Sequence, residues 1–159
     1  MTAVETTGSQ AAMEELCRIS LKPLCRVHIQ LGERILMPDT PSGMRITSET
    51  VSLTFEGERL KASLRGRAAA DWLVISDNGR LGAMDVRLTA ETDDGAMIFV
   101  QYNGRMRYST DESPHVLYVA PRFETGHSKY AWLNSIQAVG KGFLDQRTRR
   151  IDYQFYELV

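Results

Sequence analysis

Four side chains in the middle of the sequence are of the types that build small-molecule sites: Trp72, Asp85, Arg87 and Tyr102. A carboxylate can take up or release a proton, and a guanidinium can hold a carbonyl or anionic oxygen. Indole and phenol rings provide flat walls on which an apolar ligand can stack. We predict that Asp85 and Arg87 act on a bound molecule and that Trp72 and Tyr102 contact it.

Two turn sequences would bring these four side chains to one face of a three-stranded sheet. Asn78-Gly79 and Asp94-Gly95 both favour two-residue type I′ turns, because each central residue must accept a positive φ. With two such turns the indole lies opposite the carboxylate and the guanidinium lies opposite the phenol, and direct cross-strand partners share a face. Val74 and Val100 fall on the same face, so we also predict them as ligand contacts.

The opposite face of that sheet would be apolar, because alternate residues of a strand point to opposite sides. It would carry Leu73, Ile75, Met84, Val86, Leu88, Met97 and Phe99. Two interpretations of the mixed face stay open. In the first, it lines the lumen of a barrel. The apolar face then points outward and needs a cover, which predicts a homo-oligomer or a docked N-terminal helix.

In the second interpretation the mixed face is an outer surface, on which Asp85 simply pairs with Arg87. The apolar face is then the only core. A single β-bulge would shift the register by one residue and exchange the two faces.

A second group of functional side chains lies between residues 122 and 134. Its members are Arg122, Glu124, Tyr130, Trp132 and Asn134. Polar and aromatic loops at a barrel mouth often bind ligands, so we predict ligand contacts for Arg122, Trp132 and Asn134. Glu124 could act as a general base, and Tyr130 could donate to a developing oxyanion. The alternative is structural: Tyr130 and Trp132 close the barrel end while Glu124 caps backbone amides.

Period-two alternation of apolar and polar residues dominates the chain and predicts strands. It is clearest at 72–76, 81–92, 96–107, 115–123, 135–143 and 150–158, and earlier at Cys25–Leu31, Val51–Phe55 and Leu60–Leu64. One helical turn is expected within Lys129–Leu133. Many short strands separated by turns indicate an all-β fold, a single antiparallel β-barrel of about 8–10 strands. We predict this domain over 19–159, preceded at 1–18 by a flexible segment with a short helix.

The composition is that of one globular domain. The chain has 159 residues, of which 43% are hydrophobic and 25% charged, and its net charge is −1. That balance argues against nucleic acids and membranes as partners. The chain has no apolar run of the ~18 residues that a membrane span needs, and no secretory signal is evident, so a cytoplasmic location is expected. The basic cluster Arg147, Arg149 and Arg150 lies in a predicted turn and is expected to be exposed.

Several kinds of site lack their sequence signatures. The two cysteines, Cys17 and Cys25, have no metal-ligand spacing, and the three histidines share no ligand spacing either, so no metal is predicted. GxSxG, GxGxxG and Walker sequences are absent, so neither an elbow nucleophile nor a nucleotide cofactor is expected.

Four segments resemble a bacterial family known as domain of unknown function 3237. They are DTPSGMRI at 39–46, DWLVISDNG at 71–79, DVRLTAETDDGAMIFVQYNG at 85–104 and RFETGHSKYAWLN at 122–134. The stretch 67–70 departs from the glycine-rich approach that is usual before the DW pair. The resemblance implies a compact antiparallel β-barrel. It implies no established activity and assigns no catalytic residue.

The function predicted from these residues is small-molecule binding in a barrel lumen. The ligand would be a hydrophobic or aromatic metabolite, and the protein would act on it as a cofactor-independent lyase, isomerase or cyclase that moves a proton. The alternatives are a non-catalytic carrier of small molecules and a structural or interaction module.

Overall fold

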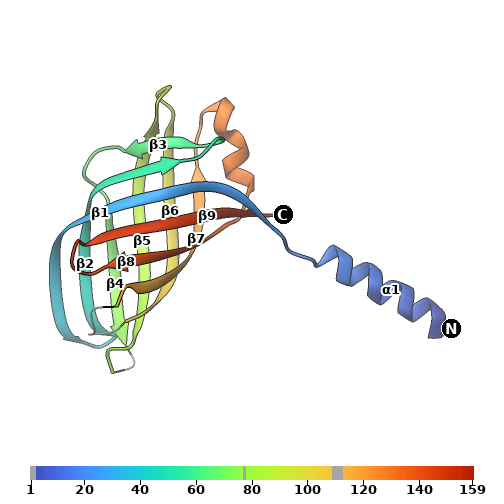
Figure 1. The fold of residues 1–159 in the computed structure, drawn as a ribbon, viewed down its shortest axis with the longest axis horizontal. Helices are drawn as coiled ribbons and strands as arrows, with labels where there is room; N and C mark the ends of the chain where they lie inside the picture. Colours follow the sequence, from blue (N-terminus) through green and yellow to red (C-terminus); the bar gives the residue numbers. More distant parts are fainter. Residues whose placement is uncertain (1–2, 77, 109–112) are drawn as a thin grey trace.

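The alternating segments form antiparallel strands that close into a barrel in the computed structural model, which describes residues 3–76, 78–108 and 113–159 (Figure 1). The nine strands within these residues are β1 (Leu21–Thr40), β2 (Gly43–Glu56), β3 (Lys61–Leu64), β4 (Ala70–Ser76), β5 (Leu81–Thr92), β6 (Met97–Arg107), β7 (His115–Glu124), β8 (Ala138–Asp145) and β9 (Arg150–Leu158). The prediction of a single antiparallel β-barrel with a short helix is confirmed.

The sheet closes because its first strand pairs on both sides. β1 pairs with β9 and also with β2, while β3 and β4 share one position between β2 and β5. Among the described residues, β1 is paired with both neighbours over Arg26–Gln30, and beyond Gln30 it pairs with β2 alone. The helix α1 (Ala3–Leu16) precedes the barrel and projects away from it (Figure 1). Among the described helices, none has the length and apolar character to cross a membrane.

The turn at Asn78-Gly79 has the predicted register. Both residues have positive φ, 53° and 82°, and Val74 pairs with Ala83. The strand β4, which carries Asp71 and Trp72, therefore pairs with β5 in the register that the sequence predicts.

The turn at Asp94-Gly95 does not have the predicted register, and the prediction of a two-residue turn there is wrong. The loop holds three residues, with Gly95 at φ 85°, and the Thr92 N–H donates to the Ala96 carbonyl at 3.0 Å. A three-residue loop ending in a left-handed glycine forms a bulge. Tyr102 consequently pairs with Val86 rather than with Arg87. The slip of one residue exchanges the two faces of β6.

One end of the barrel is closed by the 3-10 helix η1 (Ser128–Ser135), which lies between β7 and β8. Its Tyr130 and Leu133 side chains are buried in the core. Asn134 fixes the helix to the end of β7, because its Oδ1 accepts from the Thr125 N–H at 2.9 Å and its Nδ2 donates to the Thr125 carbonyl at 3.0 Å.

Candidate functional site

The four side chains predicted to converge in the lumen lie on opposite sides of the barrel wall. Trp72 and Arg87 are on the outer face, where the guanidinium carbon lies 5.6 Å from the indole centre. Arg87 Nη2 donates to Asp85 Oδ2 at 2.9 Å. Tyr102 points into the core and is 3% exposed. The lumen prediction is therefore wrong for this set, and the outer-surface interpretation describes Asp85 and Arg87.

The slip at the β5–β6 turn is the physical reason for this difference. Leu73, Met84 and Val86 form the core together with Val100 and Tyr102. Met97 and Phe99, predicted on the apolar face, point outward and are 45% and 39% exposed, and Val74 is only partly buried on the outer side. Since most of the apolar face is the barrel core, it needs no outside cover. The predicted homo-oligomer therefore loses the support of an exposed apolar face and stays a prediction.

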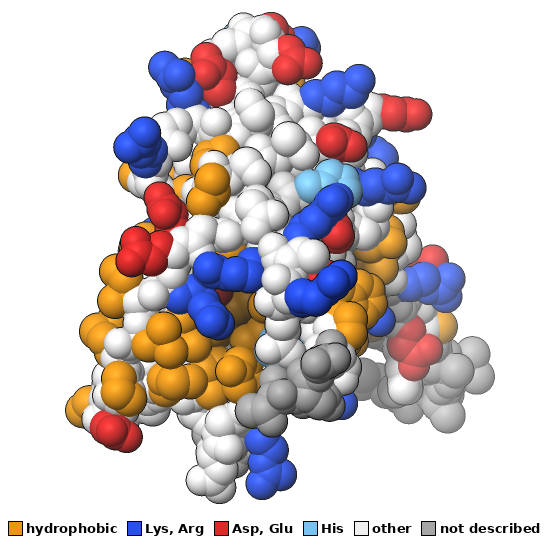
Figure 2. Space-filling view, turned by 60° about the vertical axis from the view of Figure 1, so that its left-hand side comes forward, with side chains coloured by type: hydrophobic (Ala, Val, Ile, Leu, Met, Phe, Trp, Pro, Cys, Tyr) orange, Lys and Arg blue, Asp and Glu red, His pale blue; other side chains and the backbone are white. Residues whose placement is uncertain are grey.

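The outer surface nevertheless has apolar regions. Trp72 is 40% exposed and lines a wide outer groove with Ile35 and Ala68–Ala70. With the left-hand side of the barrel turned forward, hydrophobic side chains gather over the lower part of the surface, and charged ones lie above them (Figure 2).

The second predicted group also fails to form one site. Tyr130 closes the barrel end and its hydroxyl donates to Asp94 Oδ1 at 2.9 Å. The guanidinium group of Arg59 lies over the ring of Trp132, with 4.2 Å between the guanidinium carbon and the ring centre. These placements agree with the structural alternative. Arg122 and Glu124 point outward along β7 and line a shallow groove on the surface together with Asn134.

A chamber opens at the end of the barrel opposite η1, where β6 and β8 end and β7 begins. Its volume is about 140 Å³. The polar side chains that line it are Arg34, Ser48, Tyr108, His115, Gln146 and Arg149. The apolar ones are Leu31, Ile46, Leu73, Met106 and Leu144. An engineered cavity of about 150 Å³ in another protein binds benzene. The chamber can therefore hold one ring.

Arg149 enters this chamber from the turn between β8 and β9. Asp145 Oδ1 accepts from the N–H groups of Arg147 and Thr148 at 2.9 and 3.2 Å, and Arg149 takes a left-handed φ of 58°. The Arg149 carbonyl accepts from the Leu31 N–H at 3.0 Å. Its Nη2 atom is buried and has no hydrogen-bond partner among the described residues. The prediction that this basic cluster is wholly exposed is wrong for Arg149.

Deeper in the barrel the wall carries a carboxylate and two phenols. Asp71 pairs with Ser48, which lines the chamber, and Tyr102 lies one strand beyond Val86, the β5 partner of Asp71. The rings of Tyr102 and Tyr153 meet edge to face at 6.3 Å, and their hydroxyls share a hydrogen bond. Asp71, Tyr102 and Tyr153 are called here the inner cluster, in which both phenols are buried and Asp71 is partly buried.

Burial changes the acidity of all three groups in the inner cluster. Burial raises the pKa of Asp71 from 3.8 to about 7. A hydrogen bond that its Oδ1 accepts from the Asp85 N–H at 3.1 Å lowers the pKa, but burial has the larger effect. Burial, and then the negative charge of Asp71, raise the pKa of Tyr102. Burial also raises the pKa of Tyr153 well above 10.0. At neutral pH the carboxyl group can exchange a proton while both phenols stay protonated and can donate hydrogen bonds.

The sequence prediction included Tyr102 but missed Asp71, Tyr153 and Arg149. The sequence carries a signal for Asp71 and Tyr153 but none for Arg149. Alternation places Asp71 in line with Leu73 and Ile75, so the apolar strand itself signals an inward carboxylate. Alternation likewise places Tyr153 in line with the other buried residues of β9, so it too is expected to point inward. Arg149 gave no such signal, because alternation does not say where a turn residue points.

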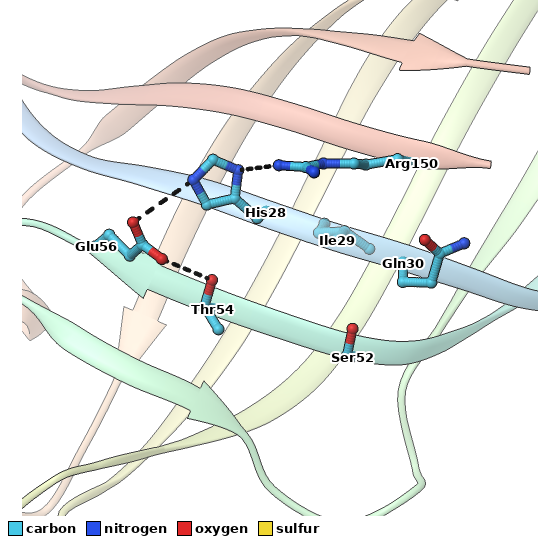
Figure 3. Close-up of a pocket in the computed structure, with 7 residues that line it drawn as sticks. All are labelled: His28, Ile29, Gln30, Ser52, Thr54, Glu56 and Arg150. Carbon is cyan, nitrogen blue, oxygen red and sulfur yellow. Dashed lines mark hydrogen bonds and ion pairs between the residues drawn. The ribbon is translucent and has the colours of Figure 1, made fainter. Parts of the chain in front are cut away.

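An outer groove of about 370 Å³ crosses β1, β2 and β9 (Figure 3). His28 Nδ1 lies 2.5 Å from Asp152 Oδ1, and its Nε2 lies 3.7 Å from Glu56 Oε2. Arg150 Nη2 lies 3.0 Å from Asp152 Oδ1. The charged groups of this groove thus satisfy one another, whereas the chamber holds a guanidinium nitrogen that has no hydrogen-bond partner among the described residues. The chamber is the stronger candidate site.

A metal centre has no candidate residues in the described parts of the chain. Within them, no three His, Cys, Asp or Glu side chains lie close enough to hold a metal ion.

Sequence comparison finds similar proteins in bacteria. A UPF0311 protein of Rhodopseudomonas palustris is 34% identical over 83 residues, which make up 45% of this chain and 54% of that protein. A UPF0311 protein of Bradyrhizobium diazoefficiens is 25% identical over 130 residues, 72% of this chain and 82% of that protein. The match with the Rhodopseudomonas proteins spans only about half of their length.

Solved structures share the fold. A β-barrel-like protein of Acinetobacter baumannii has a TM-score of 0.79 at 28% identity, covering 89% of this chain and 97% of the other. A protein described as an enzyme from Penicillium herquei has a TM-score of 0.66 at 17% identity, covering 89% and 95% of the two chains. The family described as "Protein of unknown function (DUF3237)" matches residues 19–158. The chain therefore belongs to the DUF3237 family.

Proposed function

We propose that this barrel binds a small hydrophobic or aromatic metabolite in its open-end chamber and moves a proton on it without a cofactor. The reaction class would be that of a lyase, isomerase or cyclase. The observation that carries the proposal is the inner cluster, in which a carboxyl group with a pKa of about 7 lies near two protonated phenols. A general acid or base works best when its pKa is near the working pH.

The inner cluster supplies the parts that such a reaction needs. Asp71 would take a proton from the ligand and return it at another atom. Tyr102 or Tyr153 would donate to the oxygen on which negative charge develops, and such donors stabilise an oxyanion most in a site that excludes water. These roles replace those that the sequence assigned to Asp85, Arg87, Glu124 and Tyr130. The fungal neighbour described as an enzyme supports the idea that this fold can host catalysis.

Passive binding is the second candidate. Its support is the chamber wall itself, where five apolar side chains face a ligand and would hold it without chemistry. A carrier, however, has little use for a buried carboxyl group, because burying an ionisable group costs free energy.

The test compares two aspartates on opposite sides of the same wall. Native mass spectrometry of the protein mixed with single-ring aromatic metabolites identifies ligands, and NMR of the recovered ligands detects product. We expect Asp71→Asn to bind these ligands but to lower turnover by about 100-fold or more. Asp85→Asn, on the outer face, removes only the smallest contribution to the raised pKa of Asp71 and should keep most of the turnover. Recovery of every ligand unchanged from the wild-type protein would establish the carrier instead.

A further inference from the structure

We infer that the ligand of the chamber carries an anionic group, and that Arg149 binds this group. The inference rests on the proposed function and names the chemical class of its ligand. It starts from the Nη2 atom of Arg149, which is buried at the chamber wall and has no hydrogen-bond partner in the parts of the chain that the structure describes.

An unpartnered guanidinium nitrogen is costly. A buried donor without an acceptor loses its hydration and gains nothing in return, and the penalty is larger for a charged group. Arg59, which is partly buried, avoids the penalty because its guanidinium pairs with the carboxylate of Glu157. For Arg149, no carboxylate of the described residues lies within ion-pair distance.

The local fold holds Arg149 in this position. The only carboxylate of the described β8–β9 turn residues, Asp145, accepts from backbone N–H groups of the turn. The Arg149 carbonyl is bound by the Leu31 N–H on β1. The backbone on both sides of the side chain is thus fixed, so the guanidinium is presented to the chamber before any ligand arrives. Such preorganisation lowers the entropy cost of binding.

The charge of the chamber wall has one sign. Its lining includes the guanidinium groups of Arg34 and Arg149 and, among the described residues, no Asp or Glu. Arginine binds carboxylates through two parallel hydrogen bonds, which favours a planar anion. The chamber lining also has an apolar part that includes Leu73 and Met106. A ligand with a carboxylate at one end and a single ring at the other would fit, with its ring toward the inner cluster.

The test uses benzoate and benzamide, which have the same ring and nearly the same shape but differ in charge. NMR titrations follow the methyl signals of Leu73 and Met106 in the wild-type protein, in Arg149→Gln and in Arg150→Gln. Arg150 is the matched control, because it neighbours Arg149 but lies in the outer groove. We expect benzoate to bind the wild-type protein at least tenfold more tightly than benzamide. Arg149→Gln should remove this preference, and Arg150→Gln should keep it.

The outcomes separate the inference from the function on which it rests. If both probes bind with equal affinity, or if Arg149→Gln keeps the preference for benzoate, the assignment of Arg149 as an anion-binding residue is wrong while the chamber remains a binding site. If neither probe shifts the Leu73 and Met106 signals, the chamber itself does not bind small ligands and the proposed function fails. Circular dichroism of each variant establishes that it is folded.

Discussion

At the scale of single residues, burial decides which side chains can do chemistry. Asp85 and Arg87 are attractive in the sequence, but they pair with each other on the outer face, where such a partly exposed pair contributes under about 1 kcal/mol. Asp71 is inconspicuous in the sequence, yet burial raises its pKa to about 7. Strongly shifted acidity marks candidate functional groups better than residue type does.

The shifted acidity of Asp71 predicts how stability depends on pH. Its pKa rises from 3.8 in the unfolded chain to about 7 in the folded one, so the folded protein binds the proton more tightly between these values. The stabilising contribution is therefore complete below about pH 4 and is lost as pH rises through about 7. At roughly 1.4 kcal/mol per unit of pKa, the loss is at most about 4 kcal/mol.

Urea unfolding of the wild-type protein and of Asp71→Asn between pH 4 and 8 measures this effect. The free energy of unfolding of the wild-type protein should fall with pH relative to that of the variant, by up to about 4 kcal/mol across the range. Asp85→Asn serves as the outer-face control: it removes only the smallest contribution to the raised pKa of Asp71, so its curve should stay close to that of the wild-type protein. Parallel curves for the wild-type protein and Asp71→Asn would mean that Asp71 titrates in its ordinary range.

At the scale of elements, one turn decides which face of β6 is inside. Asn78-Gly79 could be predicted because two adjacent residues with positive φ fit only one common hairpin turn. Asp94-Gly95 could not, because a two-residue turn and a three-residue loop with a bulge both place glycine at a positive φ. The two kinds of turn differ by one residue of register, and that difference moves the Tyr102 side chain from the outer face of the barrel to its core.

Two glycines with open space around them test the bulge. An added Cβ would meet no atom within 4 Å at either Gly95 or Gly126, but only Gly95 has a left-handed φ, 85°. Gly95→Ala should lower the free energy of unfolding by about 1 kcal/mol, because alanine is strained in that conformation. Gly126→Ala should be neutral within about 0.5 kcal/mol. Equal effects of the two substitutions in thermal unfolding would contradict the loop conformation described here.

At the scale of the whole molecule, the barrel is closed at one end by η1 and open at the other. The alternation of the sequence was sufficient to predict the antiparallel barrel, and the helical turn expected in the loop at 129–133 lies within η1. Alternation was not sufficient to predict the candidate site, because the chamber depends on the turn residue Arg149 and the inner cluster depends on Tyr102, whose face is decided by the bulge. Tertiary closure brings Asp71, Tyr102 and Arg149 to one lumen, and no local pattern encodes that.

A crystal structure of the protein soaked with benzoate tests the central claim most directly. The claim is that the open end of the barrel, and not its outer surface, is the ligand site. We expect the ring to lie between Leu73 and Met106, with the carboxylate on Arg149. Benzoate in the outer groove beside His28 and Arg150, with the chamber unchanged, would contradict the account.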